Sequence, residues 1–212
     1  MILPPPEPQT RRQLLRGAAA RTASAALAAA AAPGAGGVAP ASAAVAVPAA
    51  SATIDRLQRL VRVELLLEYC YRQVLSSTIL RPDARRAIAP FEGHVEAHVA
   101  ALEARLAARG ATLPPGPASV SQANRFLARR RVGGRLGHLR GDQDALRLLL
   151  SMEQVVIGAH FVALLKLSEP ALVELSAQIM ATGAQHDAVL RLLLPPHKLG
   201  SAAPYGLVQG VQ

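Results

Sequence analysis

The sequence predicts an all-α protein, and three observations favour that fold class. Alanine and leucine dominate the 212 residues, aromatic residues make up only 3%, and tryptophan is absent. Strands favour β-branched and aromatic side chains, so this composition favours helices. Four long segments carry apolar residues at helical spacing, with Pro or Gly between them. We therefore expect one antiparallel four-helix bundle with a long crossover between its second and third helices.

Residues 1–43 resemble a twin-arginine (Tat) signal peptide. Residues 10–16 read Thr-Arg-Arg-Gln-Leu-Leu-Arg, an Ala-rich stretch follows, and Ala41-Ser42-Ala43 offers a small-residue cleavage site. The apolar stretch is too short and too weakly hydrophobic to span a membrane. The alternative interpretation is a disordered basic tail. The resemblance implies export by the Tat machinery to the periplasm or the cell exterior, with residues 44–52 as a linker.

The first two predicted helices cover residues near 53–80 and 83–109. Pro82 prevents the first helix from continuing, and Gly110 ends the second. Their apolar stripes comprise Leu57, Leu60, Val61, Leu67, Tyr71, Val74 and Leu75, then Ile88, Phe91, Val95, Leu102 and Leu106.

A connection over residues 111–141 contains a short basic helix near 120–131, and its length suits a crossover better than a hairpin. The third helix covers residues near 142–168, and the fourth covers 170–194 with Pro at its first turn. Residues 53–195 thus form the bundle, and the tail 196–212 has no strong pattern.

The chain carries a net charge of +9 and one cysteine, Cys70, which excludes a disulfide within the chain. A cluster of arginines in the crossover raises the possibility of nucleic-acid binding: Arg125, Arg129, Arg130, Arg131, Arg135 and Arg140. No aromatic stacking platform or nucleic-acid motif accompanies them. We therefore expect a solvated basic loop or contact with an anionic membrane surface, and no nucleic acid.

Acids and imidazoles lie on the apolar stripes of all four helices. They are Glu64, Glu68, His94, His98, Glu153, His160 and His186. An unpaired buried carboxylate costs several kcal/mol, so these groups need partners. Hydrogen bonds between Glu and His would neutralise them, and a bound metal would do the same, because carboxylate and imidazole together suit iron, manganese or zinc.

Three short motifs resemble the ferritin-like domain of exported bacterial proteins. They are Leu67-Glu68-Tyr69, His98-Val99-Ala100-Ala101-Leu102 with the exit Gly110–Pro117, and Ala184-Gln185-His186 followed by Leu190-Arg191. The leader, the long crossover and the helix order match as well. The resemblance covers residues 53–195 and implies a ferritin-like bundle.

In that family a di-metal centre takes Glu from two helices and Glu-x-x-His from the other two. The resemblance implies four metal ligands here, with Glu64 and His94 as possible auxiliaries: Glu68, His98, Glu153 and His186. Val95 and Gly183 stand where the two Glu-x-x-His glutamates would be.

This reduced set implies one iron or other divalent transition-metal ion and not an efficient ferroxidase, which needs bridging carboxylates. The alternative is a metal-free bundle that acts as a structural or partner-binding protein of the cell envelope. The sequence carries no nucleophile motif, phosphate loop or CxxC, and it leaves the oligomeric state open.

Overall fold

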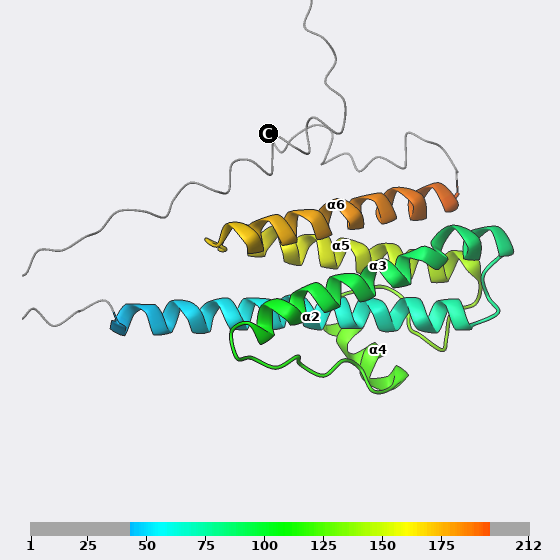
Figure 1. The fold of residues 1–212 in the computed structure, drawn as a ribbon. Coiled ribbons are helices and arrows are strands. Elements are labelled where there is room, and N and C mark those ends of the chain that lie inside the picture. The colour runs from blue at the N-terminus through cyan, green and yellow to red at the C-terminus, as the bar shows by residue number, and fades with distance from the viewer. Residues whose placement is uncertain (1–42, 196–212) are drawn as a thin grey trace, which may run out of the picture. The chain divides into compact units, whose positions relative to one another are not determined.

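The computed structural model describes residues 43–195, and these form helices α2 to α6. The helices are α2 (Ala43–Ser76), α3 (Pro82–Ala107), α4 (Val120–Arg129), α5 (Asp142–Leu164) and α6 (Pro170–Leu193) (Figure 1). Within residues 43–195 there is no strand, so the all-α prediction is confirmed. The predicted signal peptide and C-terminal tail lie outside the described residues, apart from Ala43.

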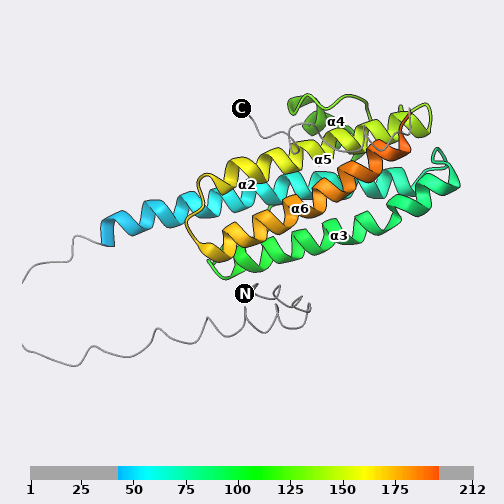
Figure 2. The same cartoon turned by 90° about the horizontal axis from the view of Figure 1, so that it is seen from above.

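The four long helices form a ring in which α2 packs against α3 and α5, and α6 packs against the same two helices. Helices α2 and α6 run in one direction and α3 and α5 in the other (Figures 1 and 2). Each neighbouring pair is therefore antiparallel. The short helix α4 lies outside the ring, against α2.

The long crossover follows from this topology, because α3 and α5 run in the same direction and the chain must return along the bundle between them. Gly110, beyond the C-terminus of α3, has φ of 68°, a left-handed conformation that glycine adopts without steric cost. Helix α4 begins where the Ser119 hydroxyl accepts a hydrogen bond from the Gln122 amide at 3.2 Å.

The linker prediction for residues 44–52 was wrong, because α2 begins at Ala43 and includes them. Alanine, which is frequent in this segment, has the highest helix propensity. The same helix ends at Ser76, four residues before the predicted end near 80.

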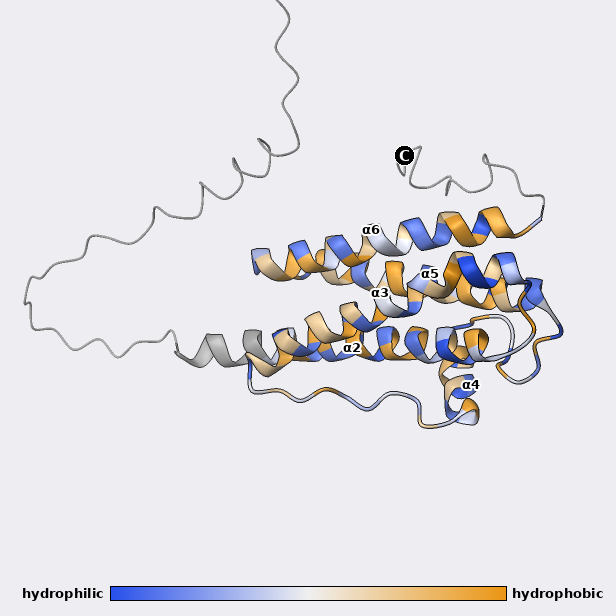
Figure 3. Ribbon diagram, turned by 45° about the vertical axis from the view of Figure 1, so that its right-hand side comes forward, coloured by the Kyte–Doolittle hydropathy of each residue, from blue (hydrophilic) through white to orange (hydrophobic). Residues whose placement is uncertain are grey.

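The core lies between the four long helices, and polar and apolar residues alternate along each of them (Figure 3). Cys70 is fully buried on α2, and burial raises the pKa of its thiol to about 12. Helix α5 is long and apolar enough to cross a membrane, but core helices of other proteins meet the same criterion. Its buried Glu153 and His160, which pair with side chains of other helices, favour the interpretation as a core helix.

Candidate functional site

The buried polar side chains form two clusters at different levels of the bundle. The Glu64 cluster contains Glu64, His98 and His160, and the Glu153 cluster contains Tyr71, His94, Glu153 and His186. Glu64 and Tyr71 are seven residues apart on α2, as are Glu153 and His160 on α5. Seven residues of helix rise about 10 Å, so the clusters occupy successive levels.

In the Glu64 cluster, one carboxylate lies between two imidazoles from other helices. The Glu64 Oε1 atom is 3.1 Å from Nε2 of His160, and its Oε2 atom is 3.5 Å from Nδ1 of His98. Glu64 and His160 are both 0% exposed. Burial alone would raise the pKa of Glu64, but the hydrogen bond from His160 and the nearby His98 imidazole together hold it below 4.5.

Three buried atoms of the Glu64 cluster have no hydrogen-bond partner among the described residues: Glu64 Oε2, His98 Nδ1 and His160 Nδ1. Buried polar atoms are nearly always paired, so these atoms are exceptions that need an explanation. The 3.5 Å between Glu64 Oε2 and His98 Nδ1 is an ion-pair distance and is too long for a good hydrogen bond.

In the Glu153 cluster, the carboxylate already has two protein donors. The Tyr71 hydroxyl donates to Glu153 Oε1 at 2.6 Å, and His186 Nδ1 lies 2.9 Å from the same oxygen. His186 Nε2 is in turn 3.0 Å from Nδ1 of His94, which lies at the surface of α3. The cluster is therefore a hydrogen-bonded chain that leads from the core to solvent.

Aromatic packing fixes the orientation of this chain. The ring of Phe91 stacks on His186 with centroids 3.9 Å apart and planes 15° from parallel. Tyr71 meets Phe91 edge to face at 6.1 Å. Burial, together with the negative charge and hydrogen bond of Glu153, raises the pKa of Tyr71 well above 10.0, so Tyr71 remains a donor at neutral pH.

The structure does not bring the four predicted metal ligands together. Glu68 turns away and pairs with Arg72 of its own helix, while Glu153 pairs with His186 and His98 lies beside Glu64. Across residues 43–195, no group of three or more His, Cys, Asp and Glu side chains has an arrangement that could hold a metal ion. Of the two predicted auxiliaries, Glu64 is the central carboxylate of one cluster and His94 ends the other.

The positions that carry the two further glutamates in a di-metal centre are closed by core packing. Val95 is fully buried among apolar side chains. A Cβ atom at Gly183 would lie 3.0 Å from Cγ1 of Ile157 and 3.4 Å from Oε2 of Glu153, which leaves no room for a glutamate side chain. The residues present therefore do not fit the family's di-metal centre.

The sequence interpretation missed Tyr71 and Asp187 as polar members of the core. Tyr71 lies on the apolar stripe, and only its hydroxyl signals a need for a buried partner. Asp187 is 2% exposed and accepts hydrogen bonds from Arg191 Nε at 2.6 Å and Gln154 Nε2 at 3.2 Å. The available signal was Arg191, four residues further along the same helix, at the spacing that lets the two side chains pair.

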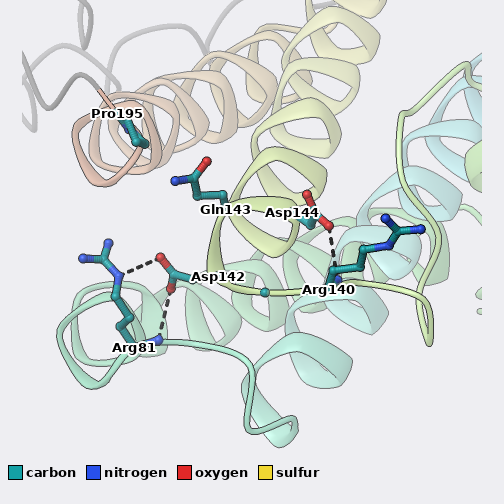
Figure 4. Close-up of a pocket in the computed structure, with 7 residues that line it drawn as sticks. Arg81, Arg140, Asp142, Gln143, Asp144 and Pro195 are labelled. Atoms are coloured by element: carbon teal, nitrogen blue, oxygen red, sulfur yellow. Dashed lines mark hydrogen bonds and ion pairs between the residues drawn. The ribbon is translucent and has the colours of Figure 1, made fainter.

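Four surface hollows of the described chain are lined by no residue of either cluster. One of about 460 Å³ lies where the start of α3 meets the start of α5. Figure 4 shows two of its contacts: Arg81 Nε donates to Asp142 at 2.8 Å, and the Arg140 backbone amide donates to Asp144. The first contact joins the start of α3 to the start of α5.

The helix arrangement, the crossover and the buried Glu and His define a ferritin-like bundle. The model of the ferritin-like domain family matches residues 52–195, and the chain belongs to that family. Its fold is also similar to the crystal structure of a conserved hypothetical protein, rv2844, from Mycobacterium tuberculosis. That similarity has a TM-score of 0.56 at 19% identity and covers 71% of this chain and 93% of the other. No curated protein matches the chain.

Proposed function

We propose that this chain is an exported ferritin-like protein that acts without a bound metal ion, as a structural or partner-binding bundle of the cell envelope. The proposal rests on the hydrogen bonding of Glu153. Its Oε1 atom already accepts hydrogen bonds from Tyr71 and His186. A carboxylate satisfied by protein donors needs no ion to offset its burial.

The packing around Gly183 supports the same proposal. The packing of Gly183 against Ile157 excludes a bridging glutamate. Two metal ions held close together for oxygen chemistry need bridging carboxylates, and Glu68 lies with Arg72 instead. The chain therefore retains the bundle while its core residues serve packing and mutual neutralisation.

Metal content and thermal stability together test this proposal. The full chain would be purified, incubated with Fe(II), Mn(II) or Zn(II), and desalted before elemental analysis. We expect well below one equivalent of each metal and a melting temperature that EDTA does not change. One tightly bound equivalent with a chelator-induced fall in melting temperature would contradict the proposal, since an ion bound only by the native state stabilises it.

A second candidate function, binding of one metal ion, is favoured by the unpartnered atoms Glu64 Oε2, His98 Nδ1 and His160 Nδ1. Glu64, His98 and His160 have no metal-holding arrangement in the described chain, so their side chains would have to reorient to bind an ion, which would then act as a Lewis acid. The discriminating variants are Glu64→Gln and Glu153→Gln. Metal-dependent stabilisation that is lost in the first and kept in the second would support this candidate.

The export part of the proposal rests on Arg11 and Arg12 and is tested separately. Residues 1–52 would be fused to a fluorescent reporter that is active outside the cytoplasm only if it folds before export. We expect export with the natural leader and retention after Arg11→Lys with Arg12→Lys, because the signal resembles one read through its arginine pair. Equal export of both fusions would contradict a Tat route.

A further inference from the structure

A basic surface with an apolar floor lies beside the C-terminal part of α5. A pocket of about 230 Å³ there is lined by four cations: Arg56, Arg59, Arg130 and Lys166. They come from α2, from the end of α4 and from the residues just after α5, so the fold assembles them from three parts of the chain. We call these four cations and the neighbouring exposed apolar residues of α5 the basic–apolar surface.

None of the four cations forms an ion pair or side-chain hydrogen bond with another described residue, whereas five other arginines do form ion pairs. No carboxylate lines the pocket. The nearest acids along the sequence do not neutralise it, because Asp55 forms no ion pair within the described chain and Glu169 pairs with Arg109. Partial burial also lowers the pKa of Arg130, as expected for a cation that loses water without gaining a counter-charge.

The apolar component is unusually exposed for this protein. Leu60, Val63 and Ala163 form part of the pocket floor. The end of α5 adds three exposed side chains: Phe161 at 53%, Val162 at 53% and Leu165 at 71%. Val162 lines the pocket, Leu165 lies three residues after Val162, and Phe161 lies four residues before Leu165. Residues three or four apart are neighbours on a helix surface, so the three side chains form one exposed apolar stripe that begins at the pocket.

We propose that the basic–apolar surface docks the bundle on a membrane that contains anionic phospholipids. The four unpaired cations match lipid phosphates in charge, and Phe161 and Leu165 lie where they would enter the boundary between headgroups and acyl chains. Durable attachment to a membrane takes two signals, and a basic cluster beside exposed apolar side chains supplies both. This inference names the partner of the binding role proposed above and rests on that role.

A lipid surface accounts for features that a soluble anion or an acidic protein segment does not. Free phosphate would use the cations and leave Phe161, Val162 and Leu165 in water. An acidic protein segment would pair its carboxylates with the guanidinium groups and would likewise leave these exposed apolar side chains in water. The basic–apolar surface thus combines four cations with exposed apolar side chains, as peripheral membrane proteins do.

Sedimentation with lipid vesicles tests the proposal on the full chain. The probes are vesicles of phosphatidylcholine alone and vesicles of phosphatidylcholine with phosphatidylglycerol in a ratio of about 7:3, which carry an anionic surface. We expect binding to the anionic vesicles only, weakened by salt. The variant Arg56→Gln with Arg59→Gln should bind about 10- to 30-fold more weakly, because each basic residue near an anionic surface strengthens binding several-fold.

The matched control is Arg105→Gln with Arg135→Gln, which removes the same charge from exposed positions outside the pocket. It should bind like the natural chain, and its unchanged leader cancels any contribution of residues 1–42. A second variant, Phe161→Ser with Leu165→Ser, should weaken vesicle binding without changing its salt dependence. Circular dichroism would confirm that these surface variants remain folded.

Three results would overturn the proposal. The first is no binding to anionic vesicles, and the second is equal weakening by the pocket and control variants, which would indicate net charge alone. The third is displacement from vesicles by millimolar inorganic phosphate with no effect of Phe161→Ser and Leu165→Ser, which would indicate a site for a soluble anion. None of these depends on metal content, so failure here is distinguishable from failure of the proposed function.

Discussion

At the scale of single residues, Glu64 and Glu68 differ sharply although they are one turn apart on α2. Glu64 is fully buried beside His160 and His98, whereas Glu68 pairs with Arg72 near the surface. Both lie on the apolar side of a helical wheel, so spacing alone does not separate them. The difference arises because α3 and α5 close over Glu64, while Arg72 offers Glu68 a partner on its own helix.

We expect Glu64→Gln to lower the free energy of unfolding by about 3 kcal/mol, because it replaces a buried carboxylate that lies between two imidazoles by an amide with only one accepting oxygen. Glu68→Gln should cost less than about 1 kcal/mol, since exposed ion pairs contribute little. Urea denaturation of both variants measures the difference. Equal effects would contradict the difference in burial between the two carboxylates.

Tyr71 provides a second test at this scale. We expect Tyr71→Phe to cost about 1–2 kcal/mol, because Glu153 loses one of its two donors in a dry environment. Tyr69→Phe is the matched control, since Tyr69 is only partly buried and its hydroxyl has no hydrogen-bond partner among the described residues. Chemical denaturation should show a loss for the first variant and almost none for the second.

At the scale of elements, the contact between α5 and α6 depends on the absence of a side chain at Gly183. A Cβ there would meet Ile157 Cγ1 at 3.0 Å, whereas a Cβ at Gly158 of α5 would meet nothing within 4 Å. Both substitutions to alanine gain about 1 kcal/mol of helix propensity. Only Gly183→Ala must push the neighbouring helix, which costs about 1–3 kcal/mol.

We therefore expect Gly183→Ala to be less stable than Gly158→Ala by about 1–3 kcal/mol, with Gly158→Ala at or above the natural chain. Thermal and chemical unfolding of the pair measure this difference. Equal stabilisation of the two variants would show that α5 and α6 can separate enough to admit a side chain at position 183.

The helices themselves follow from the sequence, because apolar periodicity, Pro82, Pro170 and Gly110 are local signals. The crossover helix α4 was also predicted, with two extra residues at its end. Residues 44–52 were expected to be a linker between the leader and the bundle, whereas α2 begins at Ala43 and includes them. Local signals thus predict which segments are helices better than where a helix begins.

The candidate site was predictable only in part. Burial of Glu64, Glu153, His160 and His186 follows from the helical wheel and is confirmed. The sequence does not predict which Glu pairs with which His. That pairing depends on how far along the bundle each side chain lies on its own helix. His98 and His186 lie on helices that touch, yet one faces Glu64 and the other Glu153.

At the scale of the whole molecule, each of the two clusters contains one group with a shifted pKa. Glu64 makes the free energy of unfolding depend on pH in acid, and Tyr71 does so in alkali. The folded-state pKa of Glu64 is lowered, so its contribution is present above the unfolded value of 4.5 and is lost as pH falls through the folded pKa. The folded-state pKa of Tyr71 is raised, so its contribution is present below 10.0 and is lost as pH rises through the folded pKa.

We expect the free energy of unfolding, measured by urea denaturation in EDTA-containing buffer, to be greatest between these two pH values and to fall on both sides. Glu64→Gln should flatten the acid side and leave the alkaline side unchanged, because glutamine does not titrate. Tyr71→Phe should do the reverse, because phenylalanine carries no ionisable hydroxyl. If either variant changed the acid and the alkaline side of the stability curve equally, the two clusters would titrate as one unit. Their separation into two levels of the bundle would then not make them independent.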